Sequence, residues 1–369
     1  MILAGMLFRA HVDLGLMPGA GLFDLASEIR FGVLVLVLLR VGLSLTPSEI
    51  GMSGGFGLSM GTIPLFCEAL SVAALAFWLL ELPIVVAITL GVMISPISPA
   101  IVIPGLLDLH SEARGRQRRF VTGLLVGAPI DNIISVFAIG MAIDFAMTGQ
   151  GGVEMLLKLP YRVGLGLASG GCVGWLIAKV LSKNPERMSR VYLHSSTLLF
   201  WALGYMLCIA GREADFSFVL AIVSMALVLA HRSNRVGQKL ENALKGHWAW
   251  SQYALFTLIG AAVDSSQIAA LGGIALLLLL AGQCARLIGT MIASSRSSLT
   301  ISEQLGAYCA YVPKATIQAA LGALPLDRGM DSGGLILSMA VLAITIMAPL
   351  GSISLVTGTR YLLRIPRDK

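Results

Sequence analysis

Long apolar runs separated by short polar stretches dominate the chain from residue 31 onward. Eleven runs are long enough to be membrane segments, namely 31–45, 55–80, 83–107, 120–147, 161–181, 193–209, 216–230, 248–263, 268–294, 300–325 and 334–358. A membrane-spanning helix needs roughly 20 predominantly apolar residues. A twelfth, weaker piece at 1–8 is too short to span and resembles the tail of a helix. The pattern predicts an all-α polytopic membrane protein with about 11–12 spans, and leaves open whether the first helix is missing.

The polar loops alternate in charge along the chain. Basic residues gather in every second loop from residue 108 onward and in the tail: Arg114, Arg116, Arg118 and Arg119; Lys183, Arg187 and Arg190; Arg232, Arg235, Lys239 and Lys245; Arg296; and Arg360, Arg364, Arg367 and Lys369. Threading the eleven runs through these loops places all the basic ones on one side. Cytoplasmic loops carry the excess of Lys and Arg. We therefore predict a multi-pass protein of the cell (inner) membrane with its C-terminus in the cytoplasm.

Two sets of apolar runs are predicted to cross the membrane in opposite directions. With this threading, 55–80 and 268–294 cross the membrane in opposite senses, as do the two runs that follow each of them. Inverted-topology repeats are the usual plan of secondary transporters. Sequence similarity between the halves is weak, so the positions of helix breaks are the better support for a repeat.

Proline interrupts two of the apolar runs. The stretch ISPISPAIVIP places Pro96, Pro99 and Pro104 inside run 83–107, and AYVPKATIQAALG places Pro313 inside run 300–325. Proline removes a helical hydrogen bond, and backbone groups freed in hydrocarbon must be satisfied by protein or line a cavity. Two interrupted spans in corresponding halves point to a transport site. A pair of merely kinked helices is the alternative.

Ionisable residues inside the apolar runs are few. Asp131 lies about 16 Å along its helix, close to the bilayer centre, and Asn132 follows it. Glu68, Arg286 and Lys314 are similarly deep in their runs. A charge at mid-membrane costs a few kcal/mol, so it is normally paired or functional. The two acids balance the two bases in charge. The alternative interpretation is that these residues only form ion pairs that join helices, and this alternative is weakest for Asp131.

Other polar residues carry weaker signals. Arg40 lies close to a helix end and is interpreted as structural. Asp144 and Asp264 are at the outer ends of their runs, where either could line a mouth of the transport path, and solvation of a helix end is the preferred interpretation. No metal-ligand spacing relates the five histidines, which are His11, His110, His194, His231 and His247. The five cysteines lie in apolar runs and are interpreted as small buried residues, namely Cys67, Cys172, Cys208, Cys284 and Cys309.

The amino-acid composition further limits the class of protein to which this chain can belong. Hydrophobic residues make up 56% of the 369 positions and charged residues 12%, against about 25% charged in a soluble domain. The mean hydropathy is +0.85. These values exclude a soluble enzyme, a nucleic-acid-binding domain and a disordered chain. The net charge of +6 reflects the cytoplasmic loops. We expect no enzyme activity, cofactor, metal site or nucleic-acid partner, because no nucleophile–base or metal-ligand constellation is present.

The interrupted runs carry a resemblance to a known family. The stretches ISPISPAIVIP, APIDNIISV, RLIGT and YVPKATIQAALG are similar to those of the monovalent cation/proton antiporters, with the NHA-type sodium/hydrogen exchangers and their bacterial relatives as the nearest branch. The likeness extends from Arg40 to the last run. It implies a homodimer in the bilayer that works by elevator-type alternating access, with two crossed, discontinuous helices formed by 83–107 and 300–325.

The resemblance also implies a division of the single transporter domain, residues 1–369. The mobile core would comprise 55–147 and 268–358, the scaffold and dimerisation helices 1–45 and 193–263, and the linker helix 161–181.

Site residues follow from the same resemblance. Two adjacent acids form the family's ion site, and aligned from Ser98 they fall on Asp131 and Asn132. The Glu–Arg pair of the NHA branch falls on Glu68 and Arg286, and the lysine of the second broken helix on Lys314. The broken-helix positions are Pro96, Ser98, Pro99 and Pro313.

The second residue of the acid pair departs from the family pattern, because it is an asparagine here. Asn132 offers a neutral oxygen to a cation but cannot exchange a proton. We therefore expect exchange of one Na⁺, Li⁺ or K⁺ for one proton, with Asp131 as the titrating cation ligand. In a variant of this mechanism, Lys314 releases the proton when the cation neutralises Asp131.

Two other functions remain open from the sequence. A transporter of the same fold could carry another small solute such as an organic anion, because half-helix N-termini at a crossover can hold an anion. A non-transporting scaffold or sensor paralogue is the other, motivated by the altered acid pair and the short N-terminus. The sequence does not decide which cation is preferred, whether transport is electrogenic, or whether the protein is active.

Overall fold

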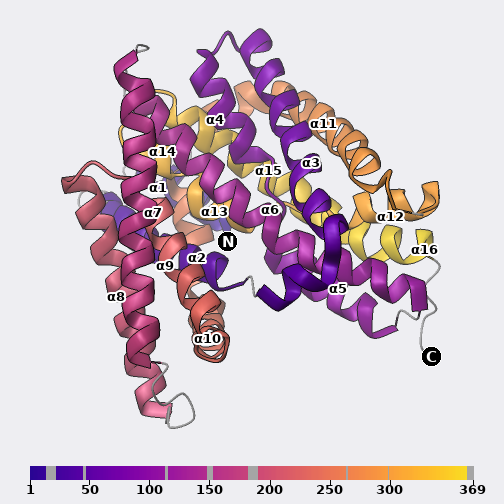
Figure 1. Cartoon of the computed structure of the whole chain (residues 1–369). Helices are drawn as coiled ribbons and strands as arrows, with labels where there is room; N and C mark the ends of the chain where they lie inside the picture. Colours follow the sequence, from indigo (N-terminus) through magenta and orange to yellow (C-terminus); the bar gives the residue numbers. More distant parts are fainter. Residues whose placement is uncertain are drawn as a thin grey trace. The chain divides into compact units, whose positions relative to one another are not determined.

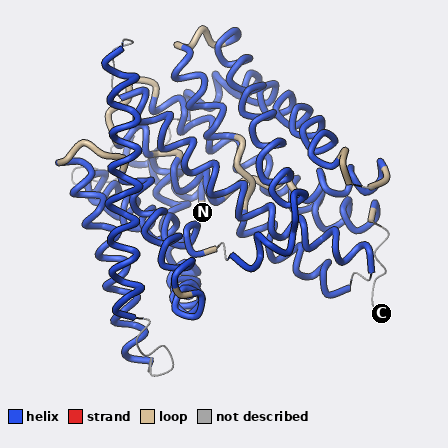
Figure 2. The backbone as a smooth tube through the Cα atoms, viewed as in Figure 1, coloured by secondary structure: helices blue, strands red, loops and turns tan. Residues whose placement is uncertain are grey.

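Helices account for all the regular structure of the part of the chain described by the computed structural model, residues 1–13, 22–44, 47–112, 115–147, 153–181, 190–262, 265–297 and 299–363. Figure 2 shows no strand among these residues. A helix satisfies its backbone hydrogen bonds internally, which is what an apolar segment needs in lipid. The predicted all-α fold class is confirmed.

Two compact units make up the chain. The first comprises Met1–Pro47 and Val136–Ala262, and the second Ser48–Ser135 and Val263–Lys369. Helix α6 (Gly115–Met147), which is labelled in Figure 1, belongs to both units, because the division falls between Ser135 and Val136.

The helices of the first unit are α1 (Ile2–Asp13), α2 (Leu22–Leu43), the second part of α6 (Gly115–Met147), α7 (Val153–Leu181), α8 (Arg190–Glu213), α9 (Phe218–Arg232) and α10 (Asn234–Ala262). Those of the second unit are α3 (Pro47–Leu79), α4 (Ile84–Ile94), α5 (Pro99–Glu112), the first part of α6, α11 (Ser265–Ser294), α12 (Ile301–Ala310), α13 (Thr316–Leu321), α14 (Leu324–Asp327), α15 (Gly333–Ile353), the π-helical turn η2 (Ser354–Thr359) and α16 (Arg360–Leu362).

Seven segments of the described chain are long and apolar enough to cross a membrane. They are Gly55–Leu79, Ile84–His110, Phe120–Met147, Pro160–Leu181, Leu193–Gly211, Leu271–Ser294 and Gly333–Leu362, and the shorter apolar helix Phe218–Arg232 adds to them. The other predicted runs lie in α2 and α10, which each carry four charged residues, and in the short helices α12–α14. The multi-pass architecture is confirmed, and the count of 11–12 spans stays a prediction.

Helix α9 is the centre of the first unit. It is buried over most of its length and contacts α2, α7, α8 and α10. Glycine permits the closest of these contacts: a Cβ on Gly170 of α7 would lie 1.9 Å from the carbonyl oxygen of Ala221. Gly166 and Gly174, one turn away on either side, approach Ser217 and Met225 in the same way. Small residues at this spacing let helix backbones pack closely in a membrane protein.

The core of the second unit surrounds two interrupted helices. A cluster of buried apolar side chains from α3, α5, α6, α12 and η2 includes Met60, Val102, Leu124 and Ala307, all with no exposed surface. Helix α15 contacts α4, α11 and α13. These contacts hold the interrupted segments from several sides and thereby position the candidate site.

Candidate functional site

The two interrupted helices meet at their breaks. Helix α4 ends at Ile94 and α5 begins at Pro99, while α12 ends at Ala310 and α13 begins at Thr316. The backbone N–H of Ser98 donates to the carbonyl oxygen of Pro313 at 2.8 Å. The hydroxyl oxygens of Ser98 and Thr316 lie 3.0 Å apart, within hydrogen-bonding distance. The breaks lie where Pro96, Pro99 and Pro313 predict them, whereas Pro104 lies inside α5 and does not interrupt it.

Prolines explain which carbonyl groups the first break leaves free. Pro99 has no N–H to donate to Ser95, and the N–H of Ser98 is diverted from Ile94 to Pro313. Both carbonyls find side-chain donors instead. Lys314 Nζ donates to the Ser95 oxygen at 2.8 Å, and Gln318 Nε2 donates to the Ile94 oxygen at 3.0 Å.

Gln318 binds the start of the first break at two carbonyl groups. Its Nε2 also donates to the carbonyl oxygen of Pro96 at 2.8 Å, so a single amide group of α13 binds carbonyls on both sides of Ser95. Arg286 Nη2 supplies a further hydrogen bond to the Ser95 oxygen. The freed backbone groups are thus satisfied by protein, as burial in a membrane requires.

Asp131 lies beside the same break. Its Oδ1 accepts a hydrogen bond from the Ile97 backbone N–H at 3.1 Å. Its Oδ2 lies 3.5 Å from Arg286 Nη1 and has no hydrogen-bond partner among the described residues. The residue has no exposed surface. The break therefore holds one oxygen of the carboxylate, and the other oxygen faces Arg286 without a hydrogen bond.

Asn132 is oriented by its own helix. Its Nδ2 donates to the carbonyl oxygen of Ala128 at 2.8 Å. Its Oδ1 is buried and, among the described residues, without a hydrogen-bond partner. Buried polar atoms without partners are rare and ask for an explanation, such as a bound ion or water. Oxygen atoms of this kind suit hard cations.

Glu68, Arg286 and Lys314 form one buried ion-pair group. Arg286 Nε contacts Glu68 Oε2, and Lys314 Nζ lies 2.8 Å from Glu68 Oε1. Gln283 Nε2 also donates to Glu68 Oε1, at 3.1 Å. All three charged side chains have no exposed surface. With Asp131, the group contains two acids and two bases, which limits the cost of burying charge.

The geometry brings together most of the residues that the sequence singled out. Asp131 contacts Arg286, Arg286 and Lys314 contact Glu68, and Ser98 and Pro313 join the breaks. Asn132 shares the helix turn of Asp131. Sequence reasoning did not single out Gln318, Gln283 or Tyr311. Polar amides inside apolar runs were the signal that could have marked the two glutamines.

Tyr311 joins the second break to α6. Its hydroxyl donates to the carbonyl oxygen of Leu124 at 2.7 Å, and the residue is completely buried. Gly127 leaves the room for this contact, since a Cβ there would lie 2.4 Å from the hydroxyl oxygen. Tyr311 therefore fixes the helix that carries Asp131 against the second interrupted helix.

The weaker candidates lie outside this group. Asp144 is buried in the first unit, where Arg162 Nη1 lies 3.5 Å from its carbonyl oxygen. The Arg40 guanidinium lies 5.6 Å from the ring centroid of Trp248, which suits a structural role. Asp264 and the side chain of His11 lie outside the described residues.

The interpretation of the cysteines as uniformly buried is wrong. Cys208 is buried, but Cys67 and Cys309 are partly exposed, and Cys172 and Cys284 are exposed on their units. A cysteine in an apolar run can lie on the face that packs against other helices or on the face that is exposed. The sequence alone does not distinguish these two faces, because both are apolar.

The sequence matches the family described as "Sodium/hydrogen exchanger, transmembrane" over residues 1–358. The chain belongs to this family. Human sodium/hydrogen exchanger 9B2 is 26% identical over 363 residues, covering 92% of this chain and 65% of the human protein. The mouse protein of the same name is 27% identical over 341 residues, covering 89% of this chain and 61% of its own length.

A solved structure shares the fold. The sodium proton antiporter MjNhaP1 from Methanocaldococcus jannaschii superposes with a TM-score of 0.74 over 98% of this chain and 90% of that chain, at 16% sequence identity. The antiporter fold expected for this exchanger-family chain is therefore confirmed. The chain spans only 61–65% of the length of the two exchangers above.

Proposed function

We propose that this chain is a secondary active transporter that exchanges a monovalent cation, Na⁺, Li⁺ or K⁺, for a proton by alternating access. Membership of the sodium/hydrogen exchanger family supports a transporter rather than an enzyme. The observation that carries the proposal is Asp131: a fully buried carboxylate beside two meeting helix breaks, with one oxygen held by Ile97 and the other without a hydrogen-bond partner among the described residues.

Asp131 is the titrating ligand in this proposal. The carboxylate holds either a proton or a cation, so one site couples the two fluxes. Asn132 Oδ1, which has no hydrogen-bond partner among the described residues, adds a neutral oxygen to this site, since alkali cations bind neutral oxygens as well as charged ones. One carboxylate that alternates between one proton and one monovalent cation predicts electroneutral, one-for-one exchange.

Lys314 offers a second route for the proton. In that version, Lys314 loses its proton when the cation neutralises Asp131, because a buried lysine can release its proton. The ion pair of Lys314 with Glu68, rather than with Asp131, favours the first route. Lys314→Ala separates the two: in the second route cation binding persists and its dependence on pH is lost.

Alternating access would divide the molecule as the resemblance implies. Residues 55–147 and 268–358 would move as the core, 1–45 and 193–263 would form the scaffold of a homodimer, and 161–181 would link them. The partition into two compact units supports this division, with its boundary inside α6 and with α7 in the first unit. The alternation of basic loops supports placement in the cell (inner) membrane with a cytoplasmic C-terminus.

The test is proton flux in sealed vesicles. The protein is reconstituted in liposomes that contain a trapped pH dye, a proton gradient is imposed, and Na⁺, Li⁺ or K⁺ is added in turn. Exchange predicts a cation-triggered collapse of the gradient, and the series gives the selectivity. No response to any of the three cations, in folded protein, would contradict the proposal and leave another cargo or a non-transporting role.

A further inference from the structure

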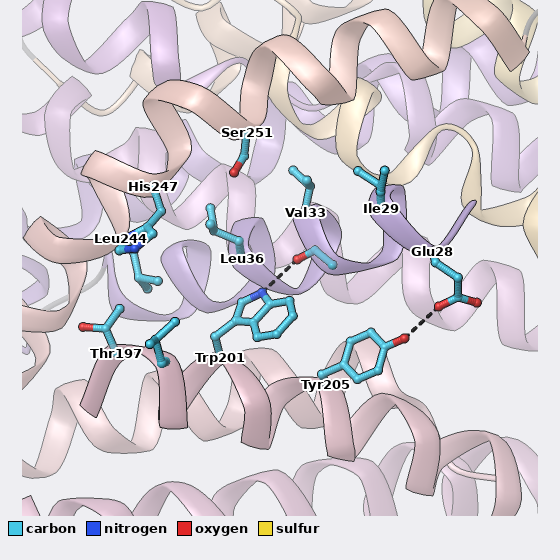
Figure 3. A pocket seen from close by; sticks show the side chains of 12 residues that line it. Glu28, Ile29, Val33, Leu36, Thr197, Trp201, Tyr205, Leu244, His247 and Ser251 are labelled. Carbon is cyan, nitrogen blue, oxygen red and sulfur yellow. Dashed lines mark hydrogen bonds between the residues drawn. The ribbon is translucent and has the colours of Figure 1, made fainter. Parts of the chain in front are cut away.

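A pocket unrelated to the ion-pair group lies within the first unit. Helices α2, α8 and α10 enclose a cavity of about 490 Å³ (Figure 3). This volume falls in the range of small-molecule sites. Apolar side chains form its walls, chiefly Val33, Leu36, Leu198 and Leu244. Leu198 is 60% exposed, so the pocket opens on the side of the unit.

One end of the pocket is built from aromatic rings and a carboxylate. Tyr205 donates its hydroxyl proton to Glu28 Oε2 at 2.7 Å, and Trp201 Nε1 donates to the Gly32 carbonyl oxygen at 3.0 Å. The two rings are stacked, with centroids 5.7 Å apart and planes inclined by 22°. Figure 3 shows Glu28 and Tyr205 together at this end. The hydrogen bonds hold both rings and the carboxylate in place.

Charge distinguishes this end from the rest of the pocket. Among the described lining residues, Glu28 is the only acidic or permanently basic side chain. Thr197, His247 and Ser251, toward the other end, are polar without a fixed charge. A carboxylate beside aromatic rings recognises an ammonium group, through charge and through the ring faces. An anionic head group at this end would be repelled by the carboxylate of Glu28.

The dimensions suit a single alkyl chain. From Glu28 to Leu36 the pocket follows α2 for about 12 Å at the helical rise. Thr197 to Tyr205 on α8 covers the same number of residues. An apolar wall of this length with a charged end matches an amphipathic molecule, which has one polar head and one apolar tail.

We propose that this pocket binds an amphiphile with an ammonium head, the head beside Glu28 and Tyr205 and the alkyl chain along Val33, Leu36 and Leu198. Both a bilayer lipid with an amino head group and a free long-chain amine have this chemistry. The pocket lies in the first unit, whereas Asp131 and the ion-pair group lie in the second, so the site is independent of the proposed ion site.

Photolabelling tests this assignment directly. The full chain is placed in nanodiscs of phosphatidylglycerol, which has no amino group, and irradiated with a decylammonium probe that carries a diazirine in its chain. Mass spectrometry should map the label to peptides of α2 and α8. A matched probe with a sulfate head should label them at least several-fold less. Equal labelling by both probes, or labelling confined to other helices, would overturn the proposal.

Two variants and one control sharpen the test. Glu28→Gln removes the charge and should lower labelling by the ammonium probe by about tenfold. Glu213→Gln, which neutralises an exposed acid at the end of α8, should leave it unchanged. Ser251→Phe fills the cavity and should block both probes. Unchanged labelling in Glu28→Gln with an unaltered melting temperature would overturn the proposal.

Competition identifies the source of the ligand. Phosphatidylethanolamine added to the nanodiscs should reduce labelling if bilayer lipid occupies the pocket, and decylamine alone should do so if the pocket excludes a glycerolipid. Either result supports the assignment. Labelling that neither compound reduces would contradict it.

Discussion

Lys314 and Glu68 form an ion pair with no exposed surface, Nζ to Oε1 at 2.8 Å, and Arg286 shares the same carboxylate. The single carboxylate of Glu68, on α3, therefore pairs with two basic side chains. Arg286 belongs to α11, and Lys314 lies at the break between α12 and α13. Removing Glu68 would take the shared carboxylate from both bases and leave Arg286 with the more distant Asp131, 3.5 Å away.

Glu68→Gln should therefore be strongly destabilising. The two positive charges of Arg286 and Lys314 would lose their shared partner, at a cost of about 3–5 kcal/mol. The melting temperature in detergent measures the effect. The double variant Glu68→Gln/Lys314→Met should recover part of the loss, because it removes one of the orphaned charges. A single variant as stable as the parent would show that the group does not stabilise the fold.

Gln318→Met should disturb the first break. The substitution keeps the size of the side chain but removes the donor to the carbonyls of Ile94 and Pro96. Each buried acceptor left unsatisfied costs about 1–3 kcal/mol. We expect a lower melting temperature and a lower exchange rate in liposomes. Gln252→Met, which removes an amide that donates to Ala249 of its own helix, is the control and should alter neither quantity.

Two glycines of α7 should respond oppositely to alanine. Gly170→Ala places a Cβ against the Ala221 carbonyl oxygen, and overpacking of this kind costs about 1–3 kcal/mol. Gly164 has open space around it, so Gly164→Ala should be neutral or stabilising because alanine favours helix. Thermal melting of both variants measures the difference. Equal melting temperatures would contradict the close packing of α7 and α9.

Cation and proton should compete. If both occupy Asp131, each unit decrease in pH below the titration of the site raises the half-saturating Na⁺ concentration by about tenfold, while the maximal rate at saturating Na⁺ is preserved. Exchange rates measured over a matrix of pH and Na⁺ concentration test this. A half-saturating concentration that does not change with pH would exclude a shared site.

Local signals made much of the site predictable from the sequence. Proline removes a helical hydrogen bond, so Pro96, Pro99 and Pro313 indicated where the two breaks lie. Proline alone does not decide this, since Pro64, Pro129 and Pro349 lie inside continuous helices. Buried charge needs a partner in any fold, so Glu68, Asp131, Arg286 and Lys314 could be recognised as a set. The same rules do not say which partners pair, and the association of Lys314 with Glu68 is visible only in three dimensions.

Other features depend on tertiary contacts that leave little trace in the sequence. Gln318 binds the break because α13 meets α4, and Tyr311 reaches Leu124 because Gly127 leaves room for its hydroxyl group. Pro104 lies in the same motif as Pro96 yet is accommodated inside α5. The pocket beside Glu28 joins residues of three helices, and none of these helices contains the carboxylate, the aromatic rings and the apolar wall together.

The most direct test of Asp131 as the shared ligand counts protons released when the cation binds. Purified protein in weak buffer with a pH dye receives saturating Na⁺, Li⁺ or K⁺, and the dye reports the release. The account predicts release of up to one proton per chain, absent in Asp131→Asn and retained in Asp144→Asn, a buried acid of the first unit. Release that persists undiminished in folded Asp131→Asn would show that another group carries the proton.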